Sequence, residues 1–270
     1  MTTLTMYQVD AFTHRLFGGN PAAVVPLERW INDSLLQAIA KENNLSETAF
    51  FVETGTHYQL RWFTPATEVP LCGHATLASA WVIFNELDPE LNEIQFSSLS
   101  GPLSVRRLDR GWMELDFPAF ATEALEAQDA TALSKAMGAR PSESLRVLDK
   151  ENAMLVFERA EQVRGLTPDL RSLQSLPYAG VIATAPGDDC DFVSRYFAPA
   201  VGIDEDPVTG SIHCGLTPYW AERLGKTTLD ARQISSRGGV LRCTLRGDRV
   251  GIAGQAVPYL TGELTLGEEN

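Results

Sequence analysis

The sequence predicts an α/β fold made of two similar domains, and three features indicate it. The first is strand-like alternation of apolar and polar residues at 5–12 and 58–63, with further strands expected at 112–117 and 181–186. The second is a segment at 34–44 that carries apolar residues at helical spacing. Strands that are separated by few helices are typical of a mixed α/β architecture.

The third feature is an internal repeat. RWFTPA at 61–66 returns 134 residues later as RYFAPA, and VPLCGHA at 69–75 returns 137 residues later as DPVTGSI. Phe, Pro and Gly are common residues, so a chance match is the alternative. The shared order of strand, aromatic-x-Pro-Ala, acidic loop, Pro-x-x-Gly and helix favours a duplicated unit. Two such domains would meet at a cleft, which is a favoured place for a ligand site.

Composition narrows the possible functions. The 270 residues, 44% of them apolar, are enough for two globular domains with substantial cores. A formal net charge of −13, without clustered Lys and Arg, argues against a nucleic-acid partner. The sequence contains neither an apolar run of about 18 residues nor the features of a signal peptide at its start, so we expect a cytoplasmic protein with no membrane partner.

Cofactor and metal motifs are weak. The four cysteines form no CxxC pair and are expected to be free thiols, mostly small buried apolar residues: Cys72, Cys190, Cys214 and Cys243. Cys72 and His74 stand two residues apart, which leaves a zinc site as a minor alternative. Neither GxGxxG nor GxxxxGK[ST] occurs. We therefore expect no cofactor and no metal.

The repeated loops offer an anion site. A helix that begins at Gly73 or Gly210 presents unpaired backbone N–H groups and the positive end of its dipole. Glycine lets a ligand approach that backbone closely. This pattern indicates a small organic acid as substrate.

Glu47 is the candidate for proton transfer. It lies between a polar helical segment and the apolar strand that follows it, where partial burial would raise the pKa of a carboxyl group by desolvation. A carboxyl group tuned in this way can give and take protons near neutral pH. The alternative is a capping role, in which Ser46 and Glu47 end local structure.

Four motifs in register resemble the phenazine-biosynthesis PhzF-like family. They are YQVDAFTHRLFGGNPAAVV, NLSETAFFV, FTPATEVPLCGHAT and DPVTGSIHCGLTPYW, and they span nearly the whole chain. The resemblance implies a diaminopimelate-epimerase-like fold with two pseudo-symmetric domains, each a curved mixed sheet wrapped around a central helix. The expected domains are 1–117, joined by 258–270, and 118–257. Members of this family are commonly homodimers and need no cofactor or metal.

The resemblance also implies site residues. In the phenazine enzyme a glutamate shuttles a proton during isomerisation of a dihydro-hydroxyanthranilate, with a histidine, an aspartate and a serine around the substrate. Motif by motif, these fall on Glu47, His74, Asp206 and Ser211. Gly73 and Gly210 would bind the substrate carboxylate, and Asn20 is a further candidate for that role.

The function that follows is a cofactor-independent isomerase acting on a small carboxylated metabolite. Two alternatives stay open. One is a ligand-binding or scaffolding protein that has kept the fold without the chemistry. The other is an amino-acid racemase that uses Cys72, although the matching position in the second half is Thr209.

Overall fold

The computed structural model describes residues 2–148 and 151–267, which form two compact units. Unit 1 comprises residues 1–116 and 253–270, and unit 2 comprises residues 117–252. The chain enters unit 2 one residue earlier than the sequence suggested and returns to unit 1 five residues earlier.

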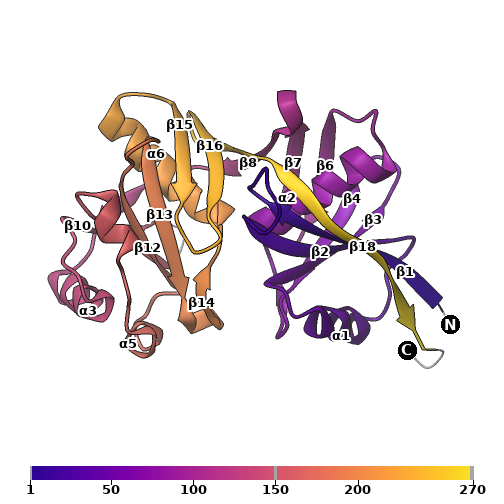
Figure 1. The fold of residues 1–270 in the computed structure, drawn as a ribbon, viewed down its shortest axis with the longest axis horizontal. Helices are drawn as coiled ribbons and strands as arrows, with labels where there is room; N and C mark the ends of the chain where they lie inside the picture. Colours follow the sequence, from indigo (N-terminus) through magenta and orange to yellow (C-terminus); the bar gives the residue numbers. More distant parts are fainter. Residues whose placement is uncertain (1, 149–150, 268–270) are drawn as a thin grey trace. The chain divides into compact units, whose positions relative to one another are not determined.

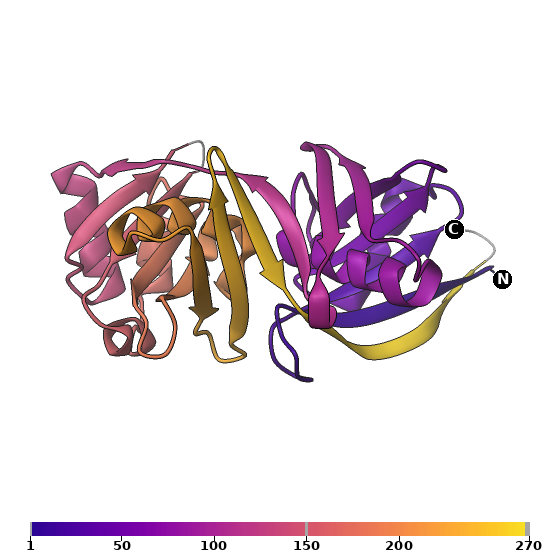
Figure 2. The same ribbon diagram turned by 90° about the horizontal axis from the view of Figure 1, so that it is seen from above.

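Unit 1 is a mixed sheet in the order β18–β1–β2–β3–β4–β6–β7–β8, with β5 paired to the end of β4. Its strands are β1 Thr2–Ala11, β2 Asn20–Leu27, β3 Glu47–Glu53, β4 Tyr58–Phe63, β5 Glu68–Val69, β6 Glu93–Ser98, β7 Gly101–Arg107, β8 Met113–Pro118 and β18 Ala256–Leu266. The C-terminal strand β18 runs antiparallel to β1 from Leu266 opposite Thr2 to Ala256 opposite Ala11 (Figures 1 and 2). The expected return of the C-terminal segment to the N-terminal strands is therefore observed.

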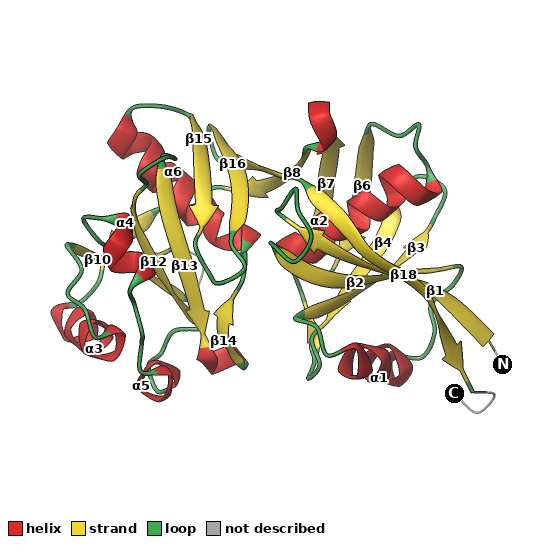
Figure 3. Cartoon of the chain, in the orientation of Figure 1, coloured by secondary structure: helices red, strands yellow, loops and turns green. Residues whose placement is uncertain are grey.

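The central helix of unit 1 is α2, Gly73–Val82, and nine of its ten residues are buried. It contacts β1, β2 and β3, and its alanines, Ala75, Ala78 and Ala80, allow that close approach. A π-helical turn, Ile83–Leu87, continues it. The second helix, α1 (Asp33–Asn43), lies outside the sheet (Figure 3) and packs its buried face against Phe50 and Phe63.

Unit 2 repeats this plan. Its strands are β9 Thr122–Ala124, β10 Glu143–Val147, β11 Asn152–Val156, β12 Gly180–Pro186, β13 Phe192–Ala198, β14 Ile203–Asp206, β15 Thr228–Gln233, β16 Gly239–Arg246 and β17 Arg249–Gly254. Its helices are α3 Ala127–Met137, α4 Ala160–Arg164, α5 Leu170–Gln174 and the largely buried α6, His213–Leu224. In both units a parallel pair, β2–β3 or β11–β12, is followed by an antiparallel partner, β4 or β13, and then by a parallel one, β6 or β15.

Strand register confirms the predicted duplication. Trp62 on β4 pairs with Val69 on β5, and Tyr196 on β13 pairs with Asp206 on β14. The two pairs are related by the same offsets of 134 and 137 residues that the sequence motifs show. The expected fold class, a mixed sheet around a central helix in each half, is observed.

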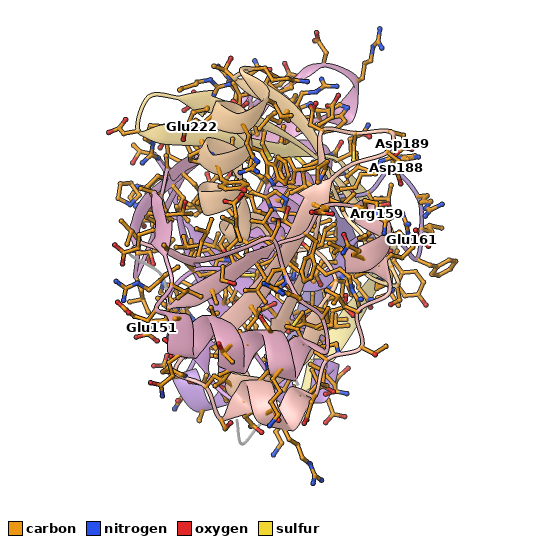
Figure 4. The ribbon with its side chains drawn as sticks, turned by 90° about the vertical axis from the view of Figure 1, so that its left-hand side faces the viewer. Glu151, Arg159, Glu161, Asp188, Asp189 and Glu222 are labelled. Atoms are coloured by element: carbon orange, nitrogen blue, oxygen red, sulfur yellow. The ribbon has the colours of Figure 1, made fainter. Side chains whose placement is uncertain are left out.

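The acidic side chains behind the net charge of −13 lie largely in solvent. On the face of unit 2 in Figure 4, five exposed carboxylates accompany one exposed arginine: Glu151, Glu161, Asp188, Asp189, Glu222 and Arg159. Among the described residues, no helix is both long and apolar enough to cross a membrane.

Candidate active site

Glu47 and His74 meet inside unit 1. Glu47 is the first residue of β3, and His74 is the second residue of α2, which packs against that strand. A carboxylate oxygen of Glu47, Oε2, lies 3.3 Å from Nε2 of His74. Both side chains are buried, with exposed fractions of 11% for Glu47 and 4% for His74. This contact is the only described salt-bridge geometry in which a histidine faces a carboxylate.

Burial keeps the His74 imidazole neutral. Desolvation lowers the pKa of His74 to about 3, while a hydrogen bond with the backbone of Pro21 acts in the opposite direction. At neutral pH the Glu47 carboxylate thus faces a dipole rather than a cation. A neutral neighbour leaves a carboxyl group freer to change its charge than an Arg or Lys would.

The opposite edge of the same ring is also occupied. Nδ2 of Asn20, the first residue of β2, lies 3.1 Å from Nδ1 of His74. The Cys72 sulfur lies 3.5 Å from the same nitrogen. Asn20 has no solvent exposure, so the substrate-contacting role considered for it does not fit its position in unit 1.

The beginning of α2 matches the expected anion site in part. The helix begins at Gly73, and the N-cap residue Cys72 makes no side-chain capping bond. Its carbonyl oxygen accepts from the backbone N–H of Thr76 at 3.2 Å and from the Thr76 hydroxyl at 2.5 Å, so the first turn is tightly closed.

Three of these side chains could hold a metal. Ligand atoms of Glu47, Cys72 and His74 all lie within 4.8 Å of one another and are buried. Carboxylate, thiolate and imidazole are ordinary zinc ligands. The set fits a three-ligand zinc site, although sequence spacing made such a site only a minor alternative.

Asp206, Gly210 and Ser211 lie together on one loop of unit 2. Asp206 is buried at the end of β14, and its carboxylate accepts a hydrogen bond from the Thr209 hydroxyl. Gln233, fully buried at the end of β15, braces this loop. Its amide nitrogen donates to the Asp206 carbonyl at 2.8 Å, and its amide oxygen accepts from the Thr209 N–H at 2.8 Å.

The helix at this loop begins differently from the expected one. Gly210–Ile212 form a 3₁₀ turn, and α6 proper begins only at His213. Nδ1 of His213 lies 2.9 Å from the Thr209 carbonyl, which would otherwise accept the first α-helical hydrogen bond. The backbone N–H of His213 bonds instead to the nearer carbonyls of Gly210 and Ser211, which tightens the turn.

The structure thus groups the predicted residues in two sets. Glu47, His74, Gly73 and Asn20 lie in unit 1, and Asp206, Gly210 and Ser211 lie in unit 2. Capping by Ser46 and Glu47 is wrong, because Asn44, in a left-handed conformation with φ of 51°, ends α1. Gln233 was missed, since it is 24 residues from Thr209 and only the pairing of β13 with β15 brings it to the loop.

Comparisons with known proteins agree with this arrangement. Residues 9–262 match the family model PhzC-PhzF, described as phenazine biosynthesis-like protein. A Pseudomonas aeruginosa protein named an uncharacterized isomerase is 51% identical over 97% of this chain and 99% of its own length. That name agrees with the enzyme class predicted from the sequence.

Solved structures support the fold. The crystal structure of a PhzF-family phenazine biosynthesis protein from Enterococcus faecalis is 45% identical and superposes with a TM-score of 0.94, covering 98% of this chain and 100% of that one. A hydroxyproline epimerase from Agrobacterium vitis, 10% identical with a TM-score of 0.60 over 97% of this chain and 92% of its own, shares the fold alone.

Proposed function

Because the chain belongs to the PhzC-PhzF phenazine biosynthesis-like family, we propose that it is a cofactor-independent isomerase that moves a proton within a small carboxylated metabolite. Glu47 is the proton shuttle. One observation carries the proposal: a buried carboxylate lies 3.3 Å from an imidazole that burial keeps neutral.

The chemistry requires a carboxyl group that changes charge during turnover. Glu47 takes a proton from one carbon of the substrate, holds it, and returns it to another atom of the same molecule. Burial slows loss of that proton to water. The contrast within unit 1 is Glu68, whose two oxygens accept from Arg61 at 2.8 Å each and which therefore stays ionised.

Substrate binding follows from the helix beginnings. The N–H groups at Gly73 favour a carboxylate, and the uncapped N-terminus of α2 supplies part of that attraction. Asp206, Gly210 and Ser211 are proposed to act on the same substrate, as the family resemblance implies. Asp206→Asn and Ser211→Ala should then lower turnover without unfolding the chain. A homodimer also remains a prediction.

Exchange of substrate protons with solvent tests the proposal. The enzyme is incubated in deuterated water with a panel of small unsaturated, amino and hydroxy carboxylic acids, and products are read by NMR and mass spectrometry. We expect isomerisation of at least one acid in the panel, with deuterium incorporation that depends on Glu47. An isomerase with a different shuttle would retain activity in Glu47→Gln, and a binding protein would shift substrate resonances without chemistry.

The same assay addresses the metal alternative. If Glu47 works as a free carboxylate, prolonged treatment with a chelator should leave the rate unchanged. Loss of activity with chelator, restored by added zinc, would assign Glu47, Cys72 and His74 to a metal site instead.

A further inference from the structure

The His74 ring is held at both of its nitrogens by groups of known hydrogen-bonding type. Nδ2 of Asn20 lies 3.1 Å from Nδ1, and Oε2 of Glu47 lies 3.3 Å from Nε2. Asn20 and His74 are buried, with exposed fractions of 0% and 4%. Three elements, β2, β3 and α2, each contribute one member of this chain of side chains.

An amide nitrogen can only donate a hydrogen bond. The Asn20 amide therefore requires Nδ1 of His74 to be the acceptor, that is, to carry no proton. A neutral imidazole has one ring proton, which must then lie on Nε2. That N–H faces a carboxylate oxygen of Glu47.

We propose that Asn20 is a positioning residue that fixes His74 in the Nε2–H tautomer, so that the imidazole donates to Glu47 and orients it as the resting proton acceptor. This inference rests on the proposed role of Glu47 as shuttle. It assigns His74 a donor's role, because Nδ1 is engaged and Nε2 already carries a proton. The mobile proton then stays on Glu47 throughout the reaction.

The chain contains an internal reference for this assignment. Nδ1 of His213, the other fully buried histidine, lies 2.9 Å from the Thr209 carbonyl oxygen, which can only accept. His213 must therefore be the Nδ1–H tautomer, opposite to His74. The remaining two of the four histidines, His14 and His57, are less buried.

Nitrogen-15 NMR of the histidine rings, recorded without substrate at neutral pH, reads the tautomers directly. Comparison with His74→Gln and His213→Gln spectra assigns the two buried rings. We expect His74 to show a protonated Nε2 and an unprotonated Nδ1, and His213 the reverse pattern. A protonated Nδ1 on His74, or an imidazolium ring, would overturn the proposal in the wild-type protein alone.

Asn20→Asp tests the cause. A carboxylate can only accept, so the ring should gain a proton at Nδ1 and become an imidazolium between two carboxylates, with its titration shifted upward by at least about two pH units. The matched control is Asn152→Asp in unit 2. Asn152 accepts from the Tyr196 hydroxyl at 2.9 Å, which a carboxylate can also do, so His74 should not change.

The activity of these variants separates the inference from the proposed function. Asn20→Asp should lower deuterium exchange at least about tenfold and change its pH profile, whereas Asn152→Asp should not. If the His74 tautomer is as expected but Glu47→Gln remains active, the proposed shuttle is wrong. An unchanged His74 ring in Asn20→Asp would refute the positioning role by itself.

Discussion

Glu47 has no acidic counterpart in the repeated unit. Thr48 pairs with Phe63 in unit 1, and Val181 pairs with Phe197 in unit 2, so Gly180 occupies the place of Glu47. A Cβ atom at Gly180 would lie 2.2 Å from the Tyr196 hydroxyl oxygen, so the phenol fills this space. A single carboxylate at these two related positions supports one shuttle rather than a pair of opposed acids.

Substitution at Glu47 and Cys72 separates the isomerase from the cysteine racemase. Glu47→Gln keeps size and hydrogen bonding but removes the titrating group, and should lower the rate by about two to four orders of magnitude. Cys72→Ala should lower it less than about tenfold and leave its pH dependence unchanged. Both are measured by deuterium exchange, with circular dichroism to verify folding.

Thiol chemistry gives an independent measurement. Cys72 is only 7% exposed, so alkylation near neutral pH should be slow in the native protein and fast after denaturation. Rapid native alkylation at Cys72, together with inactive Cys72→Ala and active Glu47→Gln, would replace the shuttle with a cysteine-dependent mechanism.

At the scale of the element, each repeated loop is closed by the same arginine–glutamate pair. Arg61 binds both oxygens of Glu68 and lies 5.1 Å from the Phe63 ring centroid. Arg195 binds both oxygens of Glu205, at 2.7 and 2.8 Å, and lies 4.7 Å from the Phe197 centroid. Bidentate pairing of this kind fixes the short strand that leads to each helix beginning.

The two pairs should have similar effects on stability. Arg195→Met leaves the Glu205 carboxylate, 25% exposed, without its guanidinium, and should lower the free energy of unfolding by about 1–3 kcal/mol in urea titrations. Arg61→Met should behave alike. Arg242→Met, which breaks an ion pair whose members are 52% and 65% exposed, should cost less than about 1 kcal/mol. Equal effects at all three arginines would deny the pairs a structural role.

At the scale of the whole molecule, two buried histidines link stability to pH. Desolvation lowers the pKa of His74 to about 3 and that of His213 to about 4, whereas both titrate near 6.5 in the unfolded chain. The unfolded state therefore binds more protons between these values. Stability from these groups is complete above about pH 6.5 and is lost as the pH falls towards 4.

His213→Gln should flatten this dependence. Glutamine can still donate to the Thr209 carbonyl but does not titrate, so its unfolding free energy should fall less between pH 7 and pH 4, by up to about 3 kcal/mol relative to wild type. Urea unfolding at several pH values measures the difference. Exposed His14→Gln is the control and should follow the wild-type curve; if His213→Gln does so too, His213 is not the linked group.

The sequence by itself determined the family, the fold class, the duplication and the isomerase class. Those features depend on local patterns: strand alternation, helical spacing and motifs that keep their offsets, because residues near one another in the chain report on their own element. The site residues and their roles remain predictions. Only the tertiary structure brought Asn20, Glu47 and His74 into one hydrogen-bonded chain, and Gln233 to the Asp206 loop. Such contacts join residues from separate strands and helices, and their hydrogen-bond geometry is decided by how those elements pack, which no local pattern encodes.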